Sequence, residues 1–513
     1  MKVARTALIA LALILISSPL YAQEESAEAE DYQVPDAYVE QVKAGGAILE
    51  LSLADAIRLS LTNNLEIEIE NYNEELNKQR VFGTKGFYDP VFTATIGWNA
   101  AKSPTTRLLE AGTIAVFERD GFLFNSAFSQ SIPWGGNYEI GFNNSRNLSN
   151  DTSATINPAY NAGLRFTFNQ PLLRGFKETQ TERQFKLFNL DTEISDKQFQ
   201  QRVSEIVQQV ENQYWELAYA IENYEARRRS LELAIVQYRN NSKRVEIGVM
   251  APIEITSSRA EVATREQEMI ASRVDIINAQ NQFKRLVAPD PGANLWDLSM
   301  IPTERPGIKD LTITLDEAIS TALKRRPEID QINLELEKNQ VDRKYYQRFG
   351  KPAIDFQAVL NPIGTSGDDI RGEESPFNGT ITTAWSQMIG FDYINWQLGV
   401  NVEIPLRNRE NESQLAQLGI ADRQMMSRMK DTQQLVIVDV RTAYESITTR
   451  KEGLEAAQVA RELSEEQLEG ENKRFEAGLS TNFEVLRYQR DLADAQVREL
   501  RAIVDYQLAL TSL

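Results

Sequence analysis

The sequence predicts an internally duplicated α+β protein in which each half combines long α-helical hairpins with short β-strands. Three observations carry this prediction: motifs recur in the same order in the two halves, very long stretches lack glycine and proline, and segments of alternating apolar and polar residues lie between the helical stretches. Self-similarity within a chain indicates an architecture built from repeated units. We therefore divide the chain into a first structural repeat at residues 51–287 and a second at residues 313–513.

The two repeats share three motifs in the same order. Each repeat opens with a segment of the form Leu-x-x-Ala-Ile, continues to a proline at a strand end and carries an Arg-x-Glu-x-Gly segment. The pairs are Leu53–Ile57 with Leu315–Ile319, Pro171 with Pro405, and Arg244–Gly248 with Arg474–Gly478. Between the repeats, residues 288–312 are rich in proline and glycine and predict a linker.

The helical stretches are longer than those of ordinary globular domains. Neither glycine nor proline occurs within Lys177–Ile247, and apolar residues recur there at helical spacing. Gly248 and Gly478 stand where each long helix must reverse into a returning helix. The pattern favours coiled-coil or tubular packing of helical hairpins. A shorter helix is predicted at the start of each repeat, over Ala54–Gln79 and Asp316–Tyr346.

Four segments alternate in the manner of β-strands, two in each repeat. They are Val91–Trp98, Leu164–Asn169, Ile354–Leu360 and Trp396–Ile404. Aromatic residues at or near their ends, such as Trp98, Trp385 and Trp396, would suit a membrane interface, but an ordinary antiparallel sheet of a soluble domain explains the pattern equally well. The first repeat also has an insertion at residues 121–145 that can form a further hairpin, and the sequence leaves its place in the fold open.

Composition excludes several classes of chemistry. The 513 residues include neither cysteine nor histidine, so disulfides, Cys/His metal sites and Ser-His-Asp triads are excluded. With 55 basic and 74 acidic residues the net charge is −19, which argues against nucleic-acid binding. No pair of acidic residues stands out at catalytic spacing. We therefore expect no enzymatic activity, no bound metal and no cofactor.

The N-terminus predicts export from the cytoplasm. Residues 1–22 have the pattern of a signal peptide, in which Lys2 and Arg5 precede the apolar run Ala7–Ile16. That run is too short for a spanning helix, which needs about 20 residues. Residues 23–50 then form an acidic mature N-terminal segment. No later apolar run is of spanning length, so any passage through a membrane must use β-strands, and four strands close a barrel only when several copies share it.

Taken together, these features resemble the TolC-like outer membrane efflux factors over about Leu51–Leu513. The resemblance rests on the duplicated opening Leu53–Ile57, the strand end Gln170–Leu173, the segment Arg474–Leu479 and the long tail Val485–Leu510. It implies a homotrimer in which four strands from each chain close a shared twelve-stranded outer-membrane β-barrel. The helical hairpins of the three chains would form a periplasmic α-barrel.

The same resemblance implies a function. Such a chain is the passive exit duct of a tripartite efflux or type I secretion system, fed by a periplasmic adaptor (membrane fusion) protein and an inner-membrane resistance-nodulation (RND) or ABC transporter. It lies in the cell outer membrane, in contact with its lipid, and has a large periplasmic portion. A periplasmic coiled-coil scaffold or tether without a pore is the alternative, because it would share the long helices, the acidity and the signal peptide. The transported substrate is not specified by the sequence.

The resemblance also implies two sites. The adaptor would dock on the hairpin tips through glycines and exposed apolar side chains, although a tight helix reversal also requires each glycine; the tip residues are Gly248, Val249, Met250, Gly478, Leu479 and Ser480. The periplasmic tunnel mouth would be formed by Glu254, Glu484, Phe475 and Arg487. In a trimer the two glutamates would form carboxylate rings that favour cations, whereas a capping box with Thr481 is the alternative role for Glu484.

Overall fold

The computed structural model describes residues 32–45, 48–104, 116–288, 292, 294–308 and 310–513. The predicted signal peptide, residues 1–22, lies outside the described residues. Within the described part of the chain, no helix combines the length and the apolar character needed to cross a membrane. The chain divides into two compact units. Of the described residues, unit 1 comprises 32–45, 220–276 and 459–498, and unit 2 comprises those within 48–219, 277–458 and 499–513.

Two series of elements follow one another along the chain, each with two helices, then strands, then two long helices; the first has four strands, and the second has two strands with helix α8 between them. The first series is α2 (Leu53–Asn63), α3 (Leu65–Lys85), β2 (Val91–Pro104), β3 (Val116–Ser131), β4 (Asn137–Ser149), β5 (Ile156–Pro171), α4 (Gln180–Glu246) and α5 (Ile253–Val287). The second series is α6 (Leu315–Arg325), α7 (Pro327–Phe349), β7 (Ala353–Asp369), α8 (Ile381–Gly390), β8 (Tyr393–Glu403), α9 (Arg409–Glu476) and α10 (Asn482–Ser512). The predicted long helices are confirmed, since α4 has 67 residues and α9 has 68.

The remaining elements are short. Helix α1 (Tyr38–Gly45) precedes the first series, and the parallel strands β1 (Ile48–Leu51) and β6 (Ser299–Pro302) form a two-stranded sheet. The 3₁₀ turns η1 and η2 cover Gly86–Tyr88 and Asn294–Trp296.

The helix that opens each repeat differs from the prediction of a single continuous helix. Ala54–Gln79 is divided between α2 and α3, because the Asn64 side chain caps α3 by accepting hydrogen bonds from the backbone of Glu66 and Ile67. Asp316–Tyr346 is divided between α6 and α7, because Pro327 begins the second helix and cannot continue the first. The break therefore has a different local cause in each repeat.

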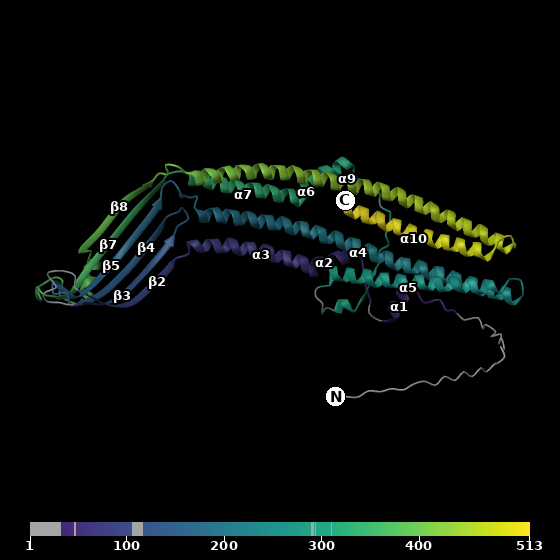
Figure 1. Ribbon diagram of the computed structural model, residues 1–513, viewed down its shortest axis with the longest axis horizontal. Helices are drawn as coiled ribbons and strands as arrows, with labels where there is room; N and C mark the ends of the chain where they lie inside the picture. Colours follow the sequence, from purple (N-terminus) through teal and green to yellow (C-terminus); the bar gives the residue numbers. More distant parts are fainter. Residues whose placement is uncertain (1–31, 46–47, 105–115, 289–291, 293, 309) are drawn as a thin grey trace, which may run out of the picture. The chain divides into compact units, whose positions relative to one another are not determined.

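Among the described residues, the main sheet of unit 2 has six antiparallel strands, whereas the sequence predicted four. Their order is β2-β3-β4-β5-β7-β8 (Figure 1). The insertion at residues 121–145 supplies most of β3 and β4, which form a hairpin between β2 and β5. The alternation in the insertion was visible in the sequence, but its pairing partners were not.

The sheet has one apolar and one polar face. A single row across the sheet runs through Phe92, Phe128, Ile140, Phe166, Leu360 and Trp396, one residue from each strand. In the adjacent row, displaced by one residue in each strand, four of the six residues are polar, namely Ser129, Glu139, Thr167 and Gln397, and the other two are Val91 and Val359. Successive side chains of a strand point to opposite faces, so these rows lie on opposite sides of the sheet.

Helix α8 covers part of the apolar face. Ala384 and Met388 of α8 are buried against Ala162 of β5. Trp385, which the sequence placed near a strand end, lies in this helix and donates a 2.7 Å hydrogen bond from Nε1 to Asn144 Oδ1. Gly364 of β7 permits the close approach, since a Cβ atom there would lie 1.9 Å from the Ala384 carbonyl oxygen.

The helical part of unit 2 is organised around a buried tyrosine. Tyr214 of α4 is fully buried, and its ring lies 6.2 Å from that of Phe283. Its hydroxyl donates to the Leu51 carbonyl and accepts from the Glu304 backbone N–H, both at 3.1 Å. Burial raises the pKa of this hydroxyl, so the neutral donor form is favoured.

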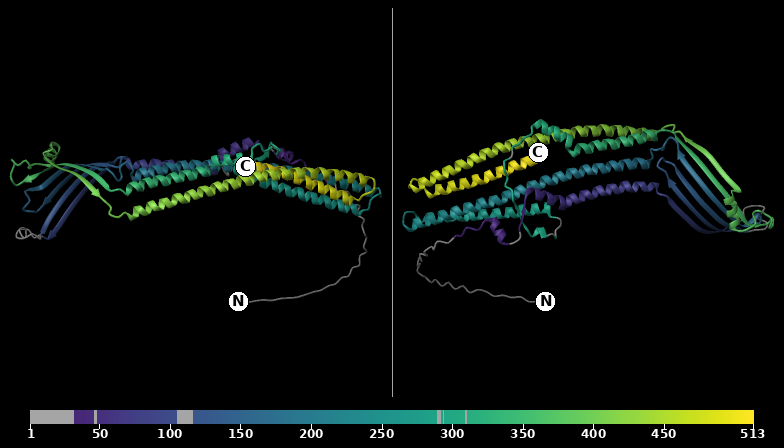
Figure 2. Two further views of the ribbon diagram at one scale, coloured as in Figure 1. Left: turned by 90° about the horizontal axis from the view of Figure 1, so that it is seen from above. Right: turned by 180° about the vertical axis from the view of Figure 1, so that it is seen from behind.

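Unit 1 contains α1 and segments of the four long helices. The α4/α5 hairpin and the α9/α10 hairpin lie side by side (Figure 1 and Figure 2). Apolar side chains from both hairpins are buried here, including Leu231, Ile235, Val262, Val485 and Leu492. Helix α1 packs on α4, where the Tyr38 backbone N–H donates a 2.7 Å hydrogen bond to Glu225 Oε1.

Candidate functional site

Both hairpin tips of unit 1 end in the same backbone motif. A glycine in the left-handed conformation follows each long helix, with φ of 77° at Gly248 and 73° at Gly478. In each tip the last carbonyls of the helix accept hydrogen bonds from this glycine and from the residue after it. The bonds are Gly248 to Val245 and Val249 to Arg244, both at 2.9 Å, and Gly478 to Phe475 and Leu479 to Arg474, at 3.1 and 2.8 Å.

The tips expose large apolar side chains. Val249 is 69% exposed and Leu479 is 72% exposed, and each directly follows its turn glycine. Met250 and Ser480 are half-buried. Ile247, Ile253 and Phe483 add further exposed apolar surface beside the same turns. Exposed apolar residues gathered in this way indicate an interaction surface.

Beneath the tips, polar side chains are buried between the hairpins. Asn482, at the start of α10, accepts a 2.7 Å hydrogen bond from Asn241 of α4 and a 3.0 Å hydrogen bond from Gln237. The Asn482 amide donates to Glu254 Oε2 of α5 at 2.9 Å. Asn241 also donates to Ser258 Oγ at 2.7 Å. Because Asn241, Ser258 and Asn482 are buried, these bonds satisfy groups that would otherwise be costly to desolvate.

The α9/α10 hairpin has its own buried polar residue at the corresponding place. Glu471 precedes Gly478 by the same interval by which Asn241 precedes Gly248, and both are buried. Ser480 donates a short hydrogen bond to Glu471, and Arg474 pairs with the same carboxylate at 3.2 Å. The sequence assigned Ser480 only to the tip surface. In the structure its hydroxyl fixes the turn to the end of α9.

The predicted mouth residues are engaged within their own chain. Glu254 joins the two hairpins through Asn482. Glu484 instead pairs with Arg487 at 2.8 Å, on the same helix, and its backbone N–H donates to Thr481 Oγ1 at 3.4 Å. This backbone bond is the half of the capping box in which the Thr481 side chain accepts.

The aromatic mouth residue also connects the hairpins. The Arg244 guanidinium of α4 lies 4.6 Å from the centre of the Phe475 ring of α9. Arg487 lies 4.8 Å from the ring of its neighbour Tyr488. The structure thus brings Glu254 and Phe475 into contact with the opposite hairpin, whereas the ion pair between Glu484 and Arg487 lies within α10.

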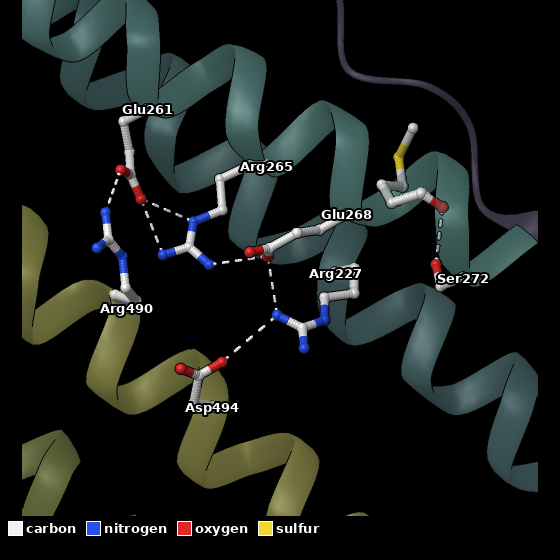
Figure 3. Close-up of polar contacts among 8 residues, drawn as sticks. Arg227, Glu261, Arg265, Glu268, Ser272, Arg490 and Asp494 are labelled. Atoms are coloured by element: carbon white, nitrogen blue, oxygen red, sulfur yellow. Dashed lines mark hydrogen bonds and ion pairs between the residues drawn. The ribbon is translucent and has the colours of Figure 1, made fainter.

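Farther along unit 1, six charged side chains of alternating sign form one connected chain (Figure 3). It runs from Arg490 to Glu261, Arg265, Glu268, Arg227 and Asp494, with successive separations of 2.6, 2.8, 3.0, 2.8 and 3.5 Å. These residues come from α10, α5 and α4. The Arg265 side chain is only 3% exposed, whereas that of Arg490 is 53% exposed. We call this set the charged chain.

The sequence did not predict two features of unit 1. One is the set of hydrogen-bonded side chains beneath the tips, Gln237, Asn241, Ser258 and Asn482, which we call the polar cluster; the other is the charged chain. Asn241, Glu261 and Arg265 lie within long helices rich in polar residues, where most such side chains face solvent, so nothing marked them as buried. One signal in the sequence could have indicated buried polar residues here: Asn241 and Glu471 precede their turn glycines, Gly248 and Gly478, by the same interval. Within the described residues, no group of three or more carboxylates is arranged to hold a metal ion.

The sequence comparisons point to one family. Residues 318–513 match the family model described as outer membrane efflux protein. No curated protein matches the sequence.

Solved structures share the fold over most of the chain. The CmeC outer membrane channel of Campylobacter jejuni has a TM-score of 0.64 at 14% identity, covering 90% of this chain and 84% of its own. A membrane protein from Pseudomonas aeruginosa has a TM-score of 0.63 at 16% identity, covering 94% and 98%. The open state of the MtrE outer membrane channel of Neisseria gonorrhoeae has a TM-score of 0.58 at 14% identity, covering 90% and 87%. The predicted α+β fold with long helical hairpins is thereby confirmed.

Proposed function

We propose that this chain, of which residues 318–513 match the outer membrane efflux protein family model, is a member of that family. On that premise, three copies form the exit duct of a tripartite efflux or type I secretion system. The duct conducts substrates passively from the periplasm to the outside. A periplasmic adaptor and an inner-membrane RND or ABC transporter supply the substrate and the energy. The sheet lies in the outer membrane and the helices lie largely in the periplasm.

The observation that carries this proposal is the two-faced sheet of unit 2. Its apolar face displays aromatic and aliphatic side chains that remain exposed in the single chain, such as Phe92, Trp396 and Leu398. Its other face displays hydroxyl, amide and charged groups. An apolar outer face around a polar interior is the pattern of membrane strands that surround water. In a soluble scaffold, so much apolar surface on one side of a sheet would be exposed to water and would favour aggregation.

Fractionation and conductance test the proposal. The full-length protein should remain with the outer membrane through a carbonate wash, and the purified oligomer should give discrete conductance steps in a planar lipid bilayer. A scaffold without a pore would be released by the wash and would leave the bilayer insulating. That second result would replace the duct with the alternative function.

We propose further that the adaptor binds the tip residues, Gly248, Val249, Met250, Gly478, Leu479 and Ser480. Support comes from the exposed apolar side chains beside two rigid turns, which present a defined surface. Leu479→Asp should abolish co-purification of the adaptor and efflux-dependent growth, because it places a charge where an apolar contact is needed. Leu479→Met keeps the apolar character and is the matched control. Equal adaptor recovery with both variants would contradict docking at this tip.

For the mouth, we propose that Glu254 and Glu484 of three copies place negative charge around the periplasmic opening. Arg487, paired with Glu484, and Phe475, which contacts Arg244 of the other hairpin, complete the proposed mouth. Carboxylates around a pore favour cations. The double substitution Glu254→Gln with Glu484→Gln should therefore reduce the cation preference seen in the reversal potential. Glu452→Gln with Glu466→Gln, on two exposed residues of α9, is the charge-matched control; an equal effect of both double variants would contradict the assignment.

A further inference from the structure

We propose that the membrane part of the assembled channel is an eighteen-stranded barrel, to which each chain contributes six strands. This inference rests on the proposed function, because it requires three copies around one pore. The family resemblance alone implied four strands from each chain and a twelve-stranded barrel. The difference comes from the hairpin of β3 and β4, which this chain inserts into its sheet.

The hairpin is an integral part of the sheet. Strand β3 pairs with β2 continuously from Val91↔Ser129 to Pro104↔Val116. Strand β4 pairs with β5 from Asn137↔Asn169 to Asn147↔Ala159. In the strand order, β3 and β4 separate β2 from β5 completely. If the hairpin were a flap above a four-stranded sheet, β2 and β5 would be neighbours.

Both inserted strands have the pattern and length of membrane strands. Phe124 and Phe128 of β3 and Ile140 of β4 share the apolar face, while Asn125 and Asn143 are paired on the polar face. Strand β3 has 16 residues and β4 has 13. A tilted strand needs only about 9–11 residues to cross the bilayer. The hairpin can therefore span the membrane together with its neighbours.

The two edges of the sheet require a further copy of this chain. Strands β2 and β8 each have one paired neighbour among the described residues, and nearly all their side chains are exposed. Unpaired backbone groups at a sheet edge are not tolerated in lipid. With an even number of antiparallel strands, β2 and β8 run in opposite directions. The β8 edge of one copy can thus continue into the β2 edge of the next with the same antiparallel pattern.

The faces also match across such a junction. Phe92, Ile96 and Trp98 of β2 lie on the same face as Trp396 and Leu398 of β8 through the rows of the sheet. Pairing β8 with β2 of the next copy extends the apolar exterior without interruption. Repeated around a threefold axis, this head-to-tail contact closes a ring. The resulting barrel has eighteen strands.

The extra strands widen the lumen. Barrel diameter grows roughly linearly with strand number, so eighteen strands give a diameter about 1.5 times that of twelve. Barrels of about 16–18 strands leave an aqueous channel. The lining would be mostly uncharged polar side chains, such as Asn125, Asn143 and Gln397. We infer that the outer part of this duct accepts bulkier solutes than a twelve-stranded barrel does.

Electron cryomicroscopy of the full-length protein in lipid nanodiscs tests the strand number. We expect a closed ring of eighteen strands contributed by three copies. A trimer with a closed ring of twelve strands and the hairpins outside it would overturn this inference while leaving the channel function intact. Separate protomers, or an assembly without a lumen, would instead contradict the proposed function.

Disulfide crosslinking in intact outer membranes gives a second test, which is unambiguous because the chain has no native cysteine. Thr95 of β2 is paired with Asn125 of β3 on the polar face. The double variant Thr95→Cys with Asn125→Cys should crosslink within the chain in assembled channels. Thr95→Cys with Thr167→Cys, on β5, is the matched control and should stay reduced. Crosslinking of the control pair alone would show that β2 contacts β5 and would overturn the six-stranded arrangement.

Discussion

Asn241 of α4 donates a 2.7 Å hydrogen bond to the side chain of Asn482 at the start of α10, and both residues are buried. This bond connects the two helical hairpins directly beneath their tips. The same Asn482 amide donates to Glu254, so the polar cluster and one predicted mouth residue form a single network. Buried polar networks stabilise one arrangement when every member is satisfied, and become costly when one partner is lost.

Asn482→Ala should therefore destabilise the tip of the protein. Removing the side chain leaves Asn241, Gln237 and Glu254 without a shared partner, which costs about 1–3 kcal/mol for a buried unsatisfied group. Hydrogen exchange of the tip segments and the melting temperature of the oligomer measure the effect. Asn472→Ala, at a half-exposed position on α9, is the control. If the two variants exchange alike, the network does not hold the hairpins together.

Arg265→Gln should be more harmful than Arg490→Gln. Arg265 is buried between Glu261 and Glu268, and removing one partner of a buried pair costs about 3–5 kcal/mol. Arg490 lies at the exposed end of the charged chain, where ion pairs contribute little, about 0–1 kcal/mol. Thermal unfolding of the two variants at low and high salt distinguishes these positions. Equal decreases in the unfolding temperature of the two variants would mean that burial does not strengthen the ion pairs of Arg265.

Gly478→Val should destabilise the second tip more than Gly478→Asn. A Cβ atom at this position meets no other atom within 4 Å, so the cost comes from the backbone conformation alone. Asparagine tolerates the left-handed conformation far better than a β-branched residue does. Adaptor binding should follow the same order as stability. If Gly478→Asn keeps full stability and still loses the adaptor, the glycine is needed for close contact with the partner.

Gly364→Ala should displace α8 from the sheet. The new Cβ atom would collide with the Ala384 backbone, and overpacking of this kind costs about 1–3 kcal/mol. Faster hydrogen exchange across α8 should report its release. Gly399→Ala, on β8, is the control because a Cβ atom there meets nothing within 4 Å. Unchanged exchange in Gly364→Ala would show that α8 is not held by this contact.

Tyr214→Phe should lower stability at neutral pH and weaken its alkaline dependence. The lost hydroxyl removes the acceptor of the Glu304 N–H, a cost of about 1–3 kcal/mol. The Leu51 carbonyl loses one hydrogen bond but still accepts from the backbone N–H and the hydroxyl of Thr303. Burial raises the pKa of the wild-type hydroxyl above its unfolded value. This group therefore contributes stability that is present below pH ~10 and is lost as the pH rises through the folded pKa. Unfolding midpoints between neutral and alkaline pH check both effects; identical pH profiles would contradict the role of Tyr214.

Much of the architecture was predictable from local physical chemistry. The absence of glycine and proline in Lys177–Ile247 leaves little to interrupt a helix, and Gly248 and Gly478 mark the reversals because a left-handed position excludes most other residues. The strand number was not predictable in this way. Alternation indicates that residues 121–145 form strands, but it does not show that these strands pair with β2 and β5 in one sheet, or that β5 pairs with β7 of the second repeat.

In the candidate site, too, features set by neighbouring residues were predictable from the sequence, and features set by packing between the hairpins were not. Exposed apolar tips follow from short-range pattern, since Val249 and Leu479 stand next to the turn glycines. The partners of the mouth residues do not, because Glu254 meets Asn482 and Phe475 meets Arg244 only through the packing of one hairpin against the other. A polar residue within a long helix looks the same in the sequence whether it faces solvent or another helix.

Crosslinking between copies in intact outer membranes tests most directly whether neighbouring chains complete one another's sheet. Single cysteines placed along the polar face of β2, at Thr93, Thr95 or Asn99, are combined with cysteines at Asn395, Gln397 or Asn401 of β8. In at least one register these pairs should give covalently linked trimers on non-reducing gels. If no register links two copies while the Thr95–Asn125 pair crosslinks within the chain, the sheet edges do not meet and the shared pore does not exist.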